Sequence, residues 1–236
     1  MLTLIPPMVG ALVGGSISLA STLFMQGRAQ KLEAAKKERE GKKAAGQRAF
    51  FGLMKLVGTF ESIENLARHF DKQLEEARGD GRGNLEPYDI YRATVGAPHE
   101  IFSLAPEEIL FLAKDHGELI ARIGEIQQRA RNDEAIAREY STSRRNLETM
   151  MLQHVSKSSA VDGPMLEMSI DQSLKVKVDV LQGQLNQMIV PLIIALEEDR
   201  KSSLEVIDDY IKIARSEFGE DFPGKRLELR GGPKVA

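Results

Sequence analysis

The sequence predicts an all-α protein, in which an N-terminal transmembrane helix is followed by an elongated, antiparallel, coiled-coil-like three-helix bundle. Residues 2–25 contain no charged side chain, and a dense run of lysines and arginines follows at once. Most of the remaining chain carries apolar residues three and four positions apart, which is the spacing of one helix face. No stretch shows the sustained alternation of apolar and polar residues that is typical of strands.

The uncharged stretch predicts a membrane anchor over residues 1–27. A bilayer core about 30 Å thick needs roughly 20 mostly apolar helical residues to cross it. Because positive charge stays on the cytoplasmic side, we expect the N-terminus outside the inner (plasma) membrane and residues 28–236 in the cytoplasm. Two other interpretations are a cleaved signal peptide, which normally carries its positive charge before the apolar stretch, and a buried helix of a soluble protein.

Small side chains recur along one face of this predicted anchor. Glycine, serine and threonine at every fourth position let two transmembrane helices approach closely. The pattern therefore predicts a homo-oligomer that packs through Gly10, Gly14, Ser18 and Thr22.

A charged helical stalk is predicted over residues 28–48, which are rich in Ala, Lys, Glu and Arg, all good helix formers. Basic residues beside a membrane attract anionic lipid headgroups. The expected contacts are Arg28, Lys31, Lys36, Lys37, Arg39, Lys42 and Lys43. Interspersed glutamates, among them Glu33 and Glu38, weaken this attraction.

The cytoplasmic bundle is predicted to span residues 49–219, followed by a flexible tail over residues 220–236. Its first helix has an apolar stripe from Phe50 to Leu74 and stops at the glycine-rich residues 79–83. An irregular loop over residues 79–104 is too apolar for a free linker, and it is the predicted contact for an unidentified protein partner.

The second helix is predicted from residue 105 to 158, with Pro106 in its first turn and a polar middle, residues 129–145, where it frays or breaks. We interpret the arginines of this middle as a solvated face. The third helix, residues 165–218, contains Pro191, which should kink it, and Gly219 follows as a cap. Its heptad pattern predicts a bundle core of Leu181, Leu185, Met188, Leu192 and Leu196.

Short connections favour antiparallel neighbours, so the three helices should run away from the membrane, back, and away again. This arrangement places the 79–104 loop at the far tip of the bundle and a turn at residues 158–164 beside the bilayer.

Composition excludes several classes of function. The chain has no cysteine, which excludes disulfides, thiolate nucleophiles and Cys-type zinc sites, and its net charge of −3 gives no general attraction to nucleic acid. None of the four histidines has a metal-ligand spacing, and His116 fits a half-buried helix position. The sequence therefore predicts no catalytic, cofactor-binding or metal-binding residue, no cofactor, and a protein that is not an enzyme.

The glycine- and serine-rich stretch from Gly10 to Ser18, with the charged stalk after Arg28, resembles bacterial proteins that join such an anchor to a helical cytoplasmic region. This likeness of architecture implies no activity. The first hypothesis is a single-pass membrane protein whose bundle is an interaction or oligomerisation scaffold. The alternatives are a membrane-disrupting lysis or defence effector of phage type, which assembles through its glycine-rich anchor, and a helical-bundle enzyme or metal protein.

Overall fold

A computed structural model describes residues 5–94, 101–154 and 172–223, with side chains from Met25 onward. Within these ranges every regular element is helical, which confirms the all-α prediction. Residues 1–24 of the predicted anchor, including the small residues from Gly10 to Thr22, lie outside the part whose side chains are described.

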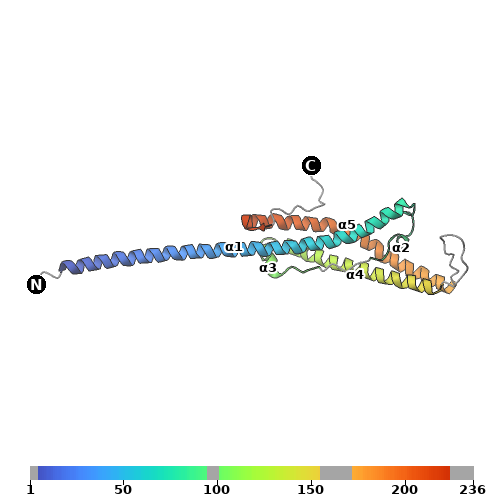
Figure 1. Ribbon diagram of the computed structural model, residues 1–236, viewed down its shortest axis with the longest axis horizontal. Coiled ribbons are helices and arrows are strands. Elements are labelled where there is room, and N and C mark those ends of the chain that lie inside the picture. The colour runs from blue at the N-terminus through green and yellow to red at the C-terminus, as the bar shows by residue number, and fades with distance from the viewer. Residues whose placement is uncertain (1–4, 95–100, 155–171, 224–236) are drawn as a thin grey trace.

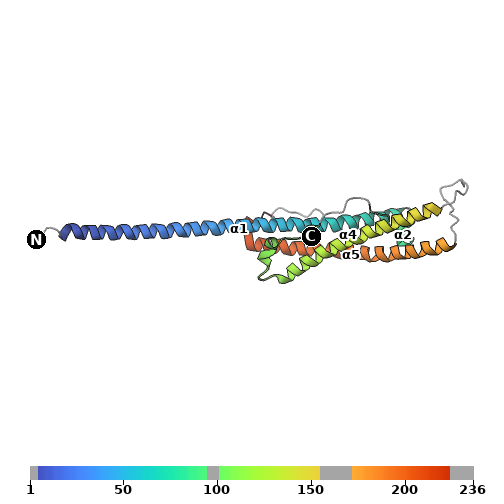
Figure 2. The same ribbon diagram turned by 90° about the horizontal axis from the view of Figure 1, so that it is seen from below.

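The first element, α1, is a single helix of 75 residues, Ile5–Gly79 (Figure 1). It joins the predicted anchor, the stalk and the first bundle helix without a break. Residues 28–43 are exposed, and continuous burial begins only near Gly46 (Figures 1 and 2). Ion pairs one turn apart, such as Lys37 with Glu33 at 3.0 Å, each stabilise this free-standing part by about 0.2–0.5 kcal/mol.

Two further long helices, α4 (Gly117–His154) and α5 (Gln172–Phe218), complete the bundle. Across α4 and α5, Arg122 pairs with Asp209 at 2.8 Å, and Arg129 pairs with Asp199 at 3.1 Å. The residue number rises on one helix while it falls on the other, so α4 and α5 are antiparallel.

The same relation holds between α1 and α5. Gly46 approaches Asp221, and Glu64 pairs with Arg200 at 2.7 Å. Since both α1 and α4 are antiparallel to α5, they run parallel to each other. The predicted order of away, back and away again is therefore wrong for both later helices, because α4 runs in the same direction as α1 and α5 runs back.

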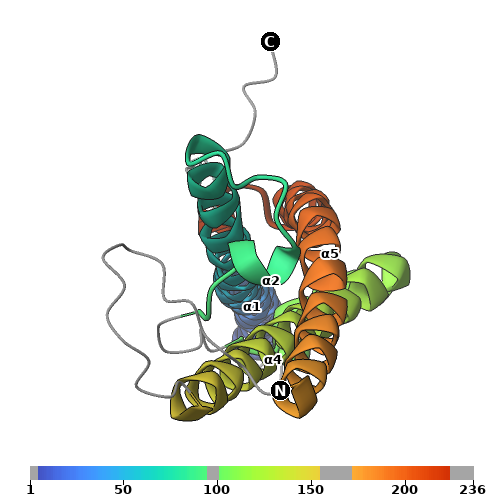
Figure 3. The same ribbon diagram turned by 90° about the vertical axis from the view of Figure 1, so that its right-hand side faces the viewer.

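The return path is a strap, residues 80–116, rather than a helix. It contains α2 (Pro87–Ile90), α3 (Pro106–Ile109) and the 3-10 turn η1 (Leu110–Leu112), with residues 95–100 outside the description. Figure 3 shows α2 between the ends of α1 and α5. The strap runs back along the bundle because its apolar residues are buried there: Tyr88, Ile90, Tyr91 and Leu112. The loop over residues 79–104 is thus not confined to the far tip.

The predicted second helix differs in two further respects. Its expected start at residue 105 is a separate short helix, and α4 begins only at Gly117. The polar middle of this predicted helix, residues 129–145, is a continuous part of α4. Charged side chains there pair with neighbouring helices, as Arg129 does with Asp199 of α5. The predicted turn at 158–164 lies outside the described residues, but the helix ends that flank it lie at the end of the bundle away from the N-terminus (Figure 1).

The C-terminal end of α5 packs against α1 near the start of the bundle. Gly219 has a φ of 57°, which confirms the expected cap, and the 3-10 turn η2 (Gly219–Asp221) follows. Phe222 is fully buried beside Phe50, so the prediction of a flexible tail from residue 220 is wrong for residues 220–222, and residues 224–236 lie outside the description. A Cβ atom at Gly46 would lie 2.6 Å from the Asp221 carbonyl oxygen, so this close approach requires glycine.

One helix among the described residues, Leu174–Asp221, is long and apolar enough to cross a membrane by length and composition. Its buried residues pack against α1 and α4, but only 22 % of this apolar stretch is buried, and the helix also carries exposed apolar side chains at Val176, Val180, Val190 and Ile194. The centre of the same helix carries the charged run from Glu197 to Lys201.

Candidate interaction face

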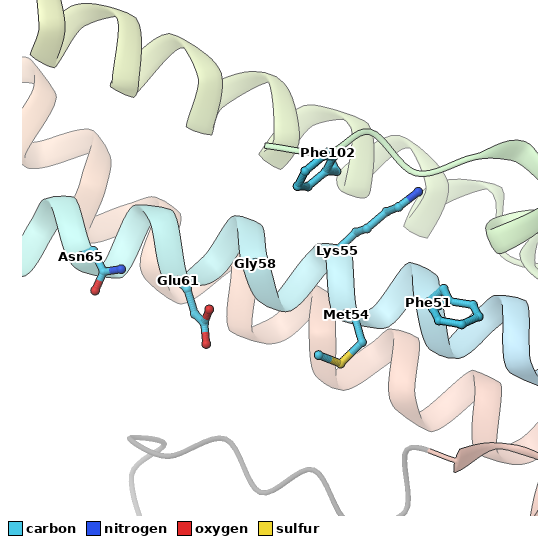
Figure 4. A pocket seen from close by; sticks show the side chains of 7 residues that line it. All are labelled: Phe51, Met54, Lys55, Gly58, Glu61, Asn65 and Phe102. Atoms are coloured by element: carbon cyan, nitrogen blue, oxygen red, sulfur yellow. The ribbon is translucent and has the colours of Figure 1, made fainter. Parts of the chain in front are cut away.

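An apolar groove lies on the outer side of α1. Three large apolar side chains there are exposed, namely Phe51 (62 %), Met54 (44 %) and Phe102 (54 %). Figure 4 shows Phe51, Met54 and Lys55 on α1, with Phe102 on the strap near Lys55. The groove encloses about 590 Å³ and is lined by Phe51, Met54, Lys55, Gly58, Glu61, Asn65 and Phe102.

Helix geometry explains why this stripe faces outward. The positions of Phe51, Met54, Gly58, Glu61 and Asn65 are three or four apart, so they share one face of α1. The opposite face carries the buried residues of the core: Ala49, Leu53, Leu56, Ile63, Ala67 and Phe70. The sequence analysis did not predict that Phe51 and Met54 are exposed, because Phe50 alone continues the apolar stripe of the buried face. The two adjacent phenylalanines, Phe50 and Phe51, were the signal of a second apolar face.

Lys55 fixes the strap beside the groove. Its ammonium lies 2.8 Å from a carboxylate oxygen of the buried Glu108 and donates to the carbonyl oxygen of Ser103 at 3.3 Å. The second oxygen of Glu108 accepts from the Ala105 backbone N–H at 2.7 Å, which caps α3. Phe102 is therefore held at a fixed place on the rim.

On the other side, α4 holds the strap through Gln127, whose side-chain amide donates to the Phe102 carbonyl oxygen at 2.9 Å. Arg131 donates to the Ser103 hydroxyl at 2.6 Å. The groove is thus built on two rigid helices and a pinned segment, which suits a preformed contact surface.

The far half of the strap is fastened by Arg144 of α4. Its guanidinium donates to the carbonyl oxygens of Tyr88 and Tyr91 and lies 4.3 Å from the centre of the Tyr88 ring. The buried Tyr140 hydroxyl donates to the same Tyr91 carbonyl at 2.6 Å. Arg144 is thus not on a solvated face, contrary to the interpretation of this arginine-rich stretch.

The predicted core residues of the last helix line the α5 side of the bundle. Leu185, Leu192 and Leu196 are buried, and Leu181 and Met188 are half-buried against the same core. The predicted headgroup contacts from Arg28 to Lys43 are all exposed on the free-standing part of α1.

The described histidines do not come together. His69 is half-buried and bonds Gln73, and burial, with a smaller effect of Lys72, lowers the pKa of His69. His116 is half-buried at the end of the strap. In the described ranges no three potential metal ligands (His, Cys, Asp or Glu) form a group that could hold a metal ion.

No family model, curated protein or solved structure matches this chain. Its groove presents apolar side chains beside Lys55 and Glu61.

Proposed function

We propose that the protein is a single-pass membrane protein whose cytoplasmic helical bundle is an interaction and self-association module. One observation supports this most strongly. The uncharged N-terminal stretch and the first bundle helix belong to the same continuous helix, α1, with an exposed charged segment between them. Such an arrangement suits a membrane anchor that carries the bundle on a helical spacer, with the N-terminus outside by the positive-inside rule.

The spacer sets the height of the bundle. From Met25 to Gly46, at 1.5 Å per residue, an upright helix holds the bundle about 30 Å from the membrane surface. Only Arg28 and Lys31 then lie within about 10 Å of the headgroups, which is the range of charge interactions at physiological salt. Lys36 to Lys43 lie farther out, so their predicted lipid contact requires a tilted spacer.

We assign the groove on α1 to a second copy of this chain. Two copies anchored in one membrane present parallel α1 helices, and their grooves lie at the same height, so the same patch can meet itself about a two-fold axis. Three exposed apolar side chains on each copy bury less area than the roughly 1,200 Å² that is typical of stable interfaces. The pairing should therefore depend on confinement of both copies in one membrane by the anchor.

Disulfide crosslinking tests this assignment, because the chain has no cysteine of its own. Gly58 in the groove and Gly124 on α4 are both exposed, and a Cβ atom at either would meet no neighbour within 4 Å. In membranes under mild oxidation, we expect Gly58→Cys to form dimers and Gly124→Cys to remain monomeric. Equal crosslinking of both variants, or no crosslinking of Gly58→Cys, would contradict the assignment.

A further inference from the structure

The middle of the bundle contains a layer of buried polar side chains. Most have a partner: Thr59 donates to the Lys55 carbonyl at 3.0 Å, and Ser62 donates to Glu134 at 2.6 Å. Asp133 of α4 and Asp199 of α5 differ from these. They are only 5 % and 1 % exposed, and one oxygen of each, Oδ2, has no hydrogen-bond partner in the described part of the chain.

Asp133 lies one helical turn after Arg129 on α4, and Arg129 pairs with Asp199 of α5, so the two buried carboxyl groups approach each other across the α4–α5 contact. The guanidinium of Arg129 donates to the other oxygen of Asp199, Oδ1, at 3.1 Å, and its charge also acts on Asp133. Two ionised carboxylates beside one guanidinium would leave an uncompensated negative charge in the core. One added proton would remove that charge and would give each orphan oxygen a partner.

We propose that Asp133 and Asp199 share one proton in the folded bundle, and that loss of this proton loosens the α4–α5 contact. This proton-responsive pair does not depend on the membrane anchor. When the proton is present, Asp133 donates to Asp199 and closes the contact. When it leaves, two like charges face each other at the centre of the bundle.

The surrounding charges do not compensate for the pair. On α4, Glu134 accepts from Ser62, and Glu125 pairs with Arg129. On α1, Glu64 pairs with Arg200 of α5, so that this arginine is already engaged. The buried amide of Gln127, also on α4, is bound to the strap. Burial, followed by repulsion from Asp199, therefore raises the pKa of Asp133 from 3.8 to about 7.

The sign of the effect follows from this shift. The folded state holds the proton more tightly than the unfolded state, so stability is highest at acidic pH and falls as the pH rises from about 4 to about 7. The ordinary pKa of an aspartate or glutamate side chain is about 4, so the fall between pH 5 and pH 8 reports the pair.

The test measures unfolding of the full chain in detergent by denaturant between pH 5 and pH 8. For the unmodified chain we expect the unfolding constant to rise about 100-fold across this range, and for Asp133→Asn to change by less than about threefold. The adjacent Glu134→Gln is the matched control and should keep the unmodified pH dependence. The proposal would be overturned if the unfolding constant of Asp133→Asn depended on pH as steeply as that of the unmodified chain, or if that of the unmodified chain did not depend on pH.

A second readout does not depend on stability. In infrared spectra of the folded protein at pH 6, the unmodified chain should show the band of a protonated carboxylic acid, and Asp133→Asn should lack it. The absence of this band from the unmodified protein would also overturn the proposal.

Discussion

Replacing Arg144 by alanine should destabilise the bundle by about 3 kcal/mol, because charge-assisted hydrogen bonds contribute about 1.5–3 kcal/mol each and their loss leaves buried carbonyls unpaired. The substitution removes the donor that serves the Tyr88 and Tyr91 carbonyls and the cation above the Tyr88 ring. The strap should detach at this end first. Denaturant unfolding measures the loss, and hydrogen exchange at the backbone of Tyr91 reports the detachment.

Arg145 provides the matched control. It is the next residue on α4 and is exposed, and within the described ranges its side chain donates to the Ser141 carbonyl of its own helix, at 3.1 Å. Arg145→Ala should change the free energy of unfolding by less than about 0.5 kcal/mol, as is usual for surface positions. Similar losses in the two variants would contradict the role assigned to Arg144.

Replacing Gly52 by alanine should cost about 2 kcal/mol, although alanine is normally the better helix former by about 1 kcal/mol. A Cβ atom at this position would lie 2.6 Å from the Tyr210 hydroxyl oxygen. That hydroxyl cannot move aside, because Tyr210 is fully buried and shares its hydrogen between the carbonyl oxygens of Ala49 and Glu108, both at 2.8 Å.

The same change at Gly58, six residues further along α1, should have the opposite sign. No atom lies within 4 Å of a Cβ atom there, so Gly58→Ala should stabilise the protein by about 0.5–1 kcal/mol. Thermal or denaturant unfolding of the two variants measures both effects. A gain in stability for Gly52→Ala would show that α1, α3 and α5 do not meet as closely as described.

Periodicity in the sequence was enough to predict the helical class and the buried faces of the long helices. Apolar residues three or four positions apart lie on one face of a helix, and such a face packs against a core. This holds for the stripe from Phe50 to Leu74 and for the heptad through Leu185 and Leu192. The cap at Gly219 was predictable for a local reason, since glycine tolerates the positive φ required there.

The direction of α4 was not predictable in this way. It depends on the strap, whose residues have no helical period and are held by distant partners, as Tyr88 is by Arg144. The prediction of antiparallel neighbours requires a short connection between α1 and α4. The chain instead returns along the bundle through the strap before α4 begins.

The interaction face and the acid pair escaped prediction for a related reason. Phe51 and Asp133 are ordinary residues in their local sequence, and only packing makes one exposed and the other buried. Close approaches at Gly46 and Gly52 are likewise set by segments far away in the chain.

The membrane anchor and its orientation are the centre of the proposed function, and labelling of single cysteines tests them most directly. The chain has no cysteine, so each variant adds a single thiol: Thr3→Cys at the start of the uncharged stretch, and Glu75→Cys on the exposed end of α1. In intact spheroplasts, a membrane-impermeant maleimide should label Thr3→Cys, and it should label Glu75→Cys only after lysis. Labelling of Glu75→Cys before lysis, or recovery of the protein in the soluble fraction, would contradict the anchored, cytoplasmic bundle.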